Sequence, residues 1–274
     1  MSDDATSVEK SGDTTTFDAS AVDNTAFDTT AANVVTPGGS TSPETSKTPA
    51  AFFDIDGTLI RGATSWYLTK EFYARRFFGV KDIAYAGYYT LRWILLGENK
   101  KDLARLRCRA LQVMKGRTET ELTQISEEVC DHILEARIIP GAKDLVDYHI
   151  SQGHEVWLVS ATPHIMARQV AKNLGATGGL GSIIDFDENG MMQGMSGDLL
   201  HGPAKAHAVT DLAGARNLDL DASYAYSDSA HDRDLFGLVG HPVAVNPEAA
   251  LKRLAKQMGW PVVNFKRRQE RRSR

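Results

Sequence analysis

Two aspartates, Asp54 and Asp56, follow an apolar run and precede a glycine, Gly57. The run ends in Phe52 and Phe53 and is typical of a strand, in which alternate residues share a face. Both carboxylates are therefore expected to leave the strand end toward the same space, with Gly57 permitting a sharp turn. A carboxylate with a second carboxyl beside it can attack a phosphorus atom and then shuttle a proton. The pair predicts the nucleophile and the acid/base of a phosphate-transferring site.

Three later segments supply the other polar groups that such a site needs. Ser160 follows the apolar run 155–159, Lys205 stands in a Gly-Pro-Ala-Lys sequence, and Asp228 and Asp232 follow a third apolar run. Because a phosphomonoester is an anion that repels nucleophiles, its site must neutralise charge as well as supply an in-line nucleophile. Alone, Ser160 is more simply a strand-terminal hydroxyl and Lys205 a surface lysine, whereas Asp228 and Asp232, four residues apart, would repel each other without a cation. Their combination indicates phosphate chemistry.

The order Asp-x-Asp-Gly-Thr, Ser, Lys and Asp-x-x-x-Asp resembles the haloacid dehalogenase (HAD) superfamily of phosphohydrolases, over residues 50–265. The resemblance implies that Asp54 forms an aspartyl-phosphate, while Asp56 protonates the leaving group and then activates water. It implies Mg²⁺ as the cofactor, held by the carboxylates of Asp54 and Asp228 and by the backbone carbonyl of Asp56. Asp232 is expected to support this set. The phosphate-binding groups that it implies are Gly57, Thr58, Ser160, Ala161 and Lys205.

Within that superfamily, the chain looks most like subfamily IB, the phosphoserine-phosphatase branch. The predicted function is a Mg²⁺-dependent phosphomonoester hydrolase acting on a small phosphorylated metabolite. Two features depart from that branch: Ala63 replaces a Glu that reads the substrate amine, and Ser160-Ala161-Thr162 replaces Ser-Gly-Gly. The alternatives are a lipid-phosphate phosphatase (lysophosphatidate or phosphatidylglycerophosphate type), a phosphomutase and a non-catalytic HAD-fold binding module.

The apolar runs and the helical patterns between most of them predict an α/β fold, a doubly wound parallel sheet with helices on both faces. Strands are expected at residues 50–53, 155–159, 182–185, 223–226 and 243–245. Three of the candidate segments then lie at the carboxyl ends of strands, where such sheets bind ligands. Pro140 is expected to open one helix and Gly153 to end it. Asn246 is expected to cap another helix, which Gly259 ends.

Residues 61–139 break this alternation and contain no convincing strand. One helix is expected over residues 101–114, and another begins with a capping box from Thr118 to Glu121. Its apolar face is expected to bury Leu122, Ile125, Val129 and Ile133. This all-helical insert after the first strand resembles a C1 cap, set on a core of residues 50–60 and 140–265. The aromatic residues between Trp66 and Trp93 form either the core of the cap or a surface that accepts an apolar leaving group.

The two ends of the chain differ in charge from the rest. The chain has 274 residues, enough for one large domain or a domain with an insert, and a net charge of −4. Residues 1–49 are acidic and rich in Ser and Thr, and are expected to be disordered. Residues 266–274 are basic; nucleic acid is not an expected partner, while a peripheral contact with anionic membrane stays open. The oligomeric state is left open.

Two features of the sequence favour a cytoplasmic location. The chain begins without a basic, apolar leader, and no apolar run approaches 18 residues in length, the span that a membrane helix needs. Cys108 and Cys130 are expected to be reduced thiols within helices.

The stretch 185–190 copies the first half of an EF-hand loop, but Ser196 stands where a bidentate Glu is required. A hairpin turn at Asn189 and Gly190 is expected instead.

Overall fold

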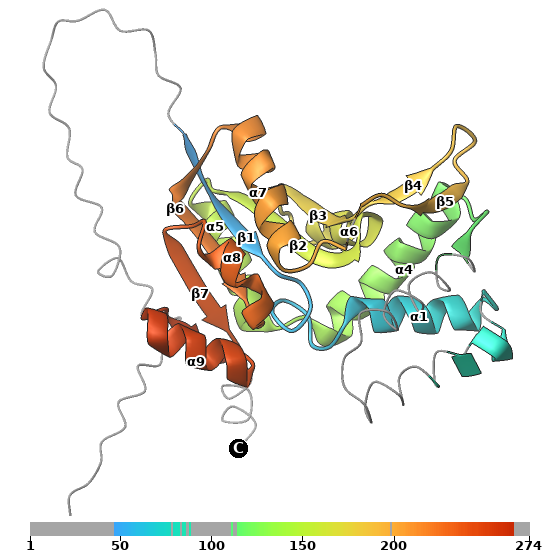
Figure 1. Ribbon diagram of the computed structural model, residues 1–274, viewed down its shortest axis with the longest axis horizontal. Coiled ribbons are helices and arrows are strands. Elements are labelled where there is room, and N and C mark those ends of the chain that lie inside the picture. The colour runs from blue at the N-terminus through green and yellow to red at the C-terminus, as the bar shows by residue number, and fades with distance from the viewer. Residues whose placement is uncertain are drawn as a thin grey trace, which may run out of the picture.

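A six-stranded parallel sheet forms the centre of the molecule (Figure 1). The computed structural model describes residues 47–77, 79–82, 84–85, 88, 111, 114–197 and 199–265. The strands lie in the order β3-β2-β1-β6-β7-β8, and every neighbouring pair is parallel. Their bounds are β1 Thr48–Phe53, β2 Glu155–Pro163, β3 Gly178–Ser182, β6 Leu218–Ser227, β7 His241–Val245 and β8 Val262–Val263.

Helices cover both faces of the sheet. The side chains of β1 alternate, so Ala51 and Phe53 face one hydrophobic cluster while Ala50 and Phe52 face the other. The first cluster contains α5 (Pro140–Ser151) and α6 (His164–Asn173), and the second contains α7 (Pro203–Arg216), α8 (Arg233–Phe236) and α9 (Ala249–Met258). A strand buried on both faces is apolar throughout, as this one is. The predicted α/β class with a doubly wound parallel sheet is confirmed.

One of the expected strands of the core was wrong. The segment 182–185 does not form one strand: β3 ends at Ser182, and Ile184 opens β4 (Ile184–Phe186), which pairs antiparallel with β5 (Met192–Met195). The sheet strand β3 is Gly-Gly-Leu-Gly-Ser, whose glycines carry no strand signal because they lack side chains. The hairpin turn at Asn189 and Gly190 is confirmed, and Gly190 has a φ of 71°.

The start of α9 also differs from the expectation. Its N-cap is Glu248 rather than Asn246, and the first helical residue is Ala249. Asn246 instead has a left-handed φ of 45°, and its Oδ1 accepts a hydrogen bond from the backbone N–H of Phe265 at 2.9 Å. Tertiary pairing with the end of the described chain thus outweighs the local capping preference. Pro140 at the start of α5 and Gly259 after α9 behave as expected.

The segment between β1 and β2 leaves and re-enters the core at one place. Ile60 and Ile138 form a bridge, and the Arg61 N–H donates to the Arg137 carbonyl at 2.9 Å. Between these points the structure describes α1 (Thr64–Ala74) and α4 (Glu119–Arg137). In Figure 1 they lie with the β4–β5 hairpin at one side of the molecule. This geometry supports the expected cap boundary, which stays a prediction.

The helix α4 follows its sequence pattern closely. Thr118 is its N-cap, and its Oγ1 accepts a hydrogen bond from the Glu121 N–H at 3.1 Å. The expected apolar face is buried, and it includes Leu122, Ile125, Val129 and Ile133. Cys130 is a buried free thiol on the same helix. These side chains join the cluster that contains α6, so α4 packs directly on the core.

Some expectations concern residues outside the described part of the chain. These are the two tails up to residue 46 and from residue 266, Cys108, and most of the helix expected over residues 101–114. Among the described residues, no helix is both long enough and apolar enough to cross a membrane.

Candidate active site

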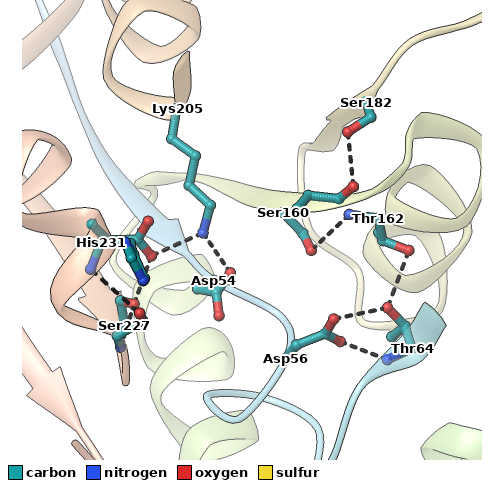
Figure 2. A network of polar contacts seen from close by, with 12 residues as sticks. Asp54, Asp56, Thr64, Ser160, Thr162, Ser182, Lys205, Ser227 and His231 are labelled. Carbon is teal, nitrogen blue, oxygen red and sulfur yellow. Dashed lines mark hydrogen bonds and ion pairs between the residues drawn. The ribbon is translucent and has the colours of Figure 1, made fainter. Parts of the chain in front are cut away.

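The candidate residues meet at the carboxyl edge of the sheet. Asp54 directly follows β1, Ser160 lies near the end of β2, and Asp228 directly follows β6. Lys205 lies in the first turn of α7, and its side chain extends toward the same edge (Figure 2). The strand order reverses at β1, since β2 lies on one side of it and β6 on the other. A crevice at such a switch point is where open α/β sheets bind ligands.

A buried ammonium group joins two carboxylates at the centre of this edge. Lys205 Nζ lies 2.6 Å from Asp54 Oδ1 and 2.8 Å from Asp232 Oδ2. Asp232 Oδ2 also accepts a hydrogen bond from the Ser227 hydroxyl at 2.6 Å. All four side chains are buried. The short helix η2 (Ala230–Asp232) brings Asp232 back toward the site, so the acid four residues after Asp228 fixes the lysine.

Burial and charge shift the pKa values of this group in opposite ways. Burial raises the pKa of the Asp54 carboxyl to about 7, although the attraction of Lys205 lowers it. Burial by itself lowers the pKa of Lys205, but the attraction of Asp54 and Asp232 outweighs it and raises this pKa above its usual value. Lys205 therefore remains charged at neutral pH. It favours the ionised Asp54 that a nucleophile requires.

Asp56 has a different partner from Asp54 (Figure 2). Its Oδ1 accepts a hydrogen bond from the Thr64 N–H at 2.8 Å, and its Oδ2 lies 3.2 Å from Thr64 Oγ1. Thr64 is the first residue of α1, whose N-cap Ala63 provides no side-chain cap, so Asp56 takes that role. Because the strand ends at Phe53, its alternation no longer fixes the direction of Asp56. The charge of Asp56 nevertheless raises the pKa of Asp54, so the two groups still act on one another, and the expectation that both carboxylates point to one space stays a prediction.

Burial raises the pKa of the Asp56 carboxyl, while the hydrogen bonds from Thr64 oppose the shift. A raised pKa lengthens the pH range over which the group holds a proton, as a general acid must. The Thr64 hydroxyl also lies 3.1 Å from the hydroxyl of Thr162. Thr162 of β2 is thus connected to Asp56 through Thr64, the first residue of α1.

Ser160 lies where β2 leaves its regular pairing with β3. The register shifts between Val159 and Pro163. There, the Thr162 N–H donates to Ser160 Oγ at 3.2 Å, and the Ala161 carbonyl accepts from the Ser182 hydroxyl at 2.7 Å. Irregular strand ends of this kind redirect side chains and backbone groups toward a site. Ser160 is buried at this edge.

Asp228 lies against the loop that carries the first two aspartates. A Cβ placed on Gly57 would be 2.0 Å from Asp228 Oδ2, so only glycine fits beside that carboxylate. Gly57 has a φ of 83°, and its N–H donates to the Ile60 carbonyl at 2.8 Å, which closes the turn. The hydroxyl of Thr58 is buried and has no hydrogen-bond partner among the described residues. It is a donor left for another acceptor.

The oxygen groups at this loop fit a hard divalent cation. Asp54 and Asp228 offer carboxylates, and the loop backbone offers carbonyl oxygens, the ligand types that Mg²⁺ prefers. Because Gly57 has no side chain, the Asp228 carboxylate lies directly against the loop that carries Asp54. The described residues hold no cluster of three or more His, Cys, Asp or Glu side chains arranged for a metal.

The sequence identified the carboxylates and the lysine but missed Thr64 and Ser227. Thr64 holds Asp56, and Ser227 holds Asp232. A signal for Thr64 was present, because Ala63, the residue directly before it, has no side chain that could cap the first N–H groups of α1. Ser227 carried no separate signal, since a hydroxyl at a strand end is common.

Comparisons with known proteins agree with this arrangement. The chain matches the haloacid dehalogenase-like hydrolase family over residues 51–236. It is 38% identical over 236 residues to phosphoserine phosphatase SerB1 of Mycobacterium tuberculosis, which covers 86% of this chain and 77% of that protein.

Two solved structures share the fold. One is a protein of unknown function from Bordetella pertussis Tohama I, with a TM-score of 0.67 and 23% identity over 80% of this chain and all of that chain. The other is a phospho-aspartyl intermediate analogue of phosphoserine phosphatase, with a TM-score of 0.54 and 19% identity over 81% of this chain and 95% of that chain. Family match, relative and fold agree: the chain belongs to the haloacid dehalogenase-like hydrolase family.

Proposed function

We propose that this protein is a Mg²⁺-dependent phosphomonoester hydrolase that works through an aspartyl-phosphate on Asp54. The observation that carries the proposal is the buried Lys205 between Asp54 and Asp232. This ammonium holds the Asp54 carboxylate at the carboxyl edge of the sheet and places positive charge where a phosphate dianion would enter. Positioning and charge neutralisation are the main demands of phosphoryl transfer.

In the first half-reaction, Asp54 would attack phosphorus, and the bond to the leaving alkoxide would break. Asp56, whose raised pKa favours the protonated form, would give its proton to that alkoxide. In the second half-reaction, Asp56 would take a proton from water as the water oxygen attacks the phosphorus. Inorganic phosphate would leave and Asp54 would be restored. For both steps Asp56 must exchange Thr64 for the reacting oxygen.

The remaining groups would bind the phosphate and the cation. Ser160, the Ala161 backbone, Lys205 and the unpartnered hydroxyl of Thr58 are suited to bind phosphoryl oxygens, while the Gly57 N–H is used in its turn. Asp54 and Asp228 with the Asp56 carbonyl would hold Mg²⁺. Bound there, the cation would neutralise the carboxylates and the developing phosphoryl charge. Asp232 would support the site through Lys205.

The substrate proposed is a small phosphorylated metabolite, with phosphoserine favoured by the likeness to phosphoserine phosphatase SerB1. Ala63 supplies no carboxylate for a substrate amine, so another acid of the helical segment would have to do so. The comparison that decides is kcat/KM for phosphoserine against lysophosphatidic acid. A preference of more than about a hundredfold for the lipid, some 3 kcal/mol, would replace this choice by a lipid phosphatase. We also propose residues 61–139 as the cap and a cytoplasmic location.

The test is phosphate release from phosphorylated metabolites with Mg²⁺, before and after chelation by EDTA. Release should stop on chelation and resume when Mg²⁺ is added back. Asp54→Asn should abolish release, whereas Asp211→Asn, at an exposed position on α7, should leave it unchanged. Full activity after metal removal would refute the cation, and near-native turnover by Asp54→Asn would refute the mechanism. Transfer of phosphate between carbons without release would show a phosphomutase.

A further inference from the structure

The outer face of α1 exposes aromatic side chains to solvent. Trp66 is 59% exposed and Tyr73 is 54% exposed, and Lys70 lies between them at helical spacing. Residues three and four apart share one face of a helix, so the three side chains form a single stripe. Lys70 Nζ lies 5.3 Å from the centre of the Trp66 ring, a cation–π contact that holds the stripe together.

This exposure is concentrated in one part of the described chain. The large hydrophobic residues that the structure leaves exposed include three aromatics, Trp66, Tyr73 and Tyr88, and all lie between residues 66 and 88. Val80, in the same stretch, is exposed as well. Single exposed apolar residues are ordinary on a protein surface, but an aligned aromatic set marks an interaction surface. Trp and Tyr in particular suit a boundary between water and an apolar phase.

The same stretch is basic in an otherwise acidic protein. Residues 61–82 contain five Lys and Arg and two Asp and Glu, a net +3, whereas the whole chain has a net charge of −4. Glu71 is the acid within α1, and its carboxylate pairs with Arg75. Arg75 also pairs with Glu128 of α4, so its charge is already compensated. The positive charge within the aromatic stripe itself is that of Lys70, beside Trp66.

The inner face of α1 is already occupied. Leu68 and Phe72 are buried in the core cluster against α4, and Phe72 stacks on Phe77 with ring centres 5.2 Å apart. The helix is therefore fixed to the body of the protein, while the side chains of its outer stripe are exposed to solvent. The stripe begins two residues after Thr64, which holds Asp56, so it borders the candidate active site.

We infer that the outer face of α1, carrying Trp66, Lys70 and Tyr73, binds the surface of an anionic lipid bilayer. The aromatic rings would lie among the headgroups while Lys70 and the neighbouring basic residues meet lipid phosphates. The charge decides against a second copy of the chain, because a two-fold contact would place two positive faces together. The inference concerns binding and stands apart from the substrate proposed above.

Flotation of the full chain with vesicles tests this directly. The protein should float with vesicles of phosphatidylcholine mixed with phosphatidylglycerol, much less with phosphatidylcholine alone, and should be released by high salt. Lys70→Glu should lower the partition coefficient at least about tenfold, since each basic charge near the surface contributes roughly fivefold. The double variant Trp66→Ser, Tyr73→Ser should lower it by about tenfold as well.

The matched control is Lys256→Glu on α9, another exposed basic helix, which carries the exposed but non-aromatic Met258. It alters the net charge as Lys70→Glu does, and should change binding by less than about twofold. Circular dichroism and hydrolysis of p-nitrophenyl phosphate verify that each variant is folded.

Three results would overturn the assignment. One is an absence of binding by the native chain. Another is binding that survives both α1 variants or falls equally in Lys256→Glu, which would place it elsewhere, such as residues 266–274. The third is a dimer without lipid binding that Trp66→Ser dissociates in sedimentation velocity, which would give the face to a second copy.

Discussion

The carboxyl edge of the sheet and the helical region of α1 and α4 use charge in different ways. At the sheet edge, Lys205 is buried between Asp54 and Asp232, which come from segments far apart in the sequence. In the helical region, the pairs Arg75–Glu71 and Arg117–Glu121 are four residues apart and partly exposed to solvent. Exposed pairs contribute little to stability, whereas a buried charge without its partner is costly. The first region is built for chemistry and the second for surface contact.

One contact between the two regions involves a candidate catalytic group. Asp56 belongs to the loop after β1, and Thr64 begins α1. The candidate acid/base therefore caps the first helix of the insert, so its position depends on where that helix lies.

The largest effect is expected on removing the buried ammonium. Lys205→Met leaves Asp54 and Asp232 facing each other in the interior, and should lower the free energy of unfolding by about 3 kcal/mol. Lys143→Met breaks the exposed pair with Asp147 and should cost less than about 1 kcal/mol. Urea unfolding at neutral pH measures both. Equal losses would show that burial does not distinguish the two pairs.

A second contrast is between a buried and an exposed histidine. His149 on α5 is buried against His154 and the Tyr226 hydroxyl, and burial lowers its pKa to about 3 from the ordinary 6.5. The unfolded chain then binds this proton more readily than the folded one. The stabilising contribution is complete above the unfolded pKa and is lost as the pH falls toward the folded value.

The free energy of unfolding should therefore fall by roughly 3 kcal/mol as the pH is lowered from about 7 to about 4, because of this residue. Comparing urea unfolding across that range for the native protein and His149→Gln isolates the contribution, which the variant lacks. His132→Gln, on the exposed side of α4, is the control and should retain the native pH dependence. If the two variants behave alike, the buried imidazole is not the source.

The contact between the two regions gives a smaller, functional effect. Thr64→Val keeps the backbone N–H to Asp56 but removes the hydroxyl, and should lower kcat/KM for phosphate release about tenfold. Thr64→Ser should keep native activity, and so should Thr69→Val, which alters an exposed threonine of the same helix. Steady-state kinetics with one soluble phosphomonoester measure all three. A normal rate in Thr64→Val would mean that Asp56 needs only the backbone contact.

The smallest effect belongs to the helical region alone. Thr118→Ala removes the N-cap of α4 and should cost about 1 kcal/mol of stability, because the Glu121 N–H loses its acceptor. The rate of hydrolysis should not change. Thr120→Ala, at an exposed position two residues later in the same first turn, is the control. A fall in kcat with Thr118→Ala would show that α4 also positions reacting groups.

Local sequence signals found most of the site because its groups follow strands directly. Asp54 after β1 and Asp228 after β6 are placed by the strands themselves. The pairing of Lys205 with Asp232 depends on how two separate segments meet, and the contact of Asp56 with Thr64 depends on the path of the loop between them, neither of which spacing alone determines. The bounds of β3 were not predicted because its glycines have no side-chain pattern. Asn246 was wrongly predicted as a helix N-cap because its side chain instead accepts a hydrogen bond from the Phe265 N–H.

The central claim is that Asp54 carries the phosphoryl group during turnover. The most direct measurement is acid quenching within the first turnover on a phosphomonoester, followed by mass mapping of the peptides. The phosphoryl group should be found on the peptide that contains Asp54, and should be lost on treatment with hydroxylamine, which cleaves acyl phosphates. Asp54→Asn should give no labelled peptide. A phosphoryl group on another residue, or turnover with none on the enzyme at any time, would contradict the account.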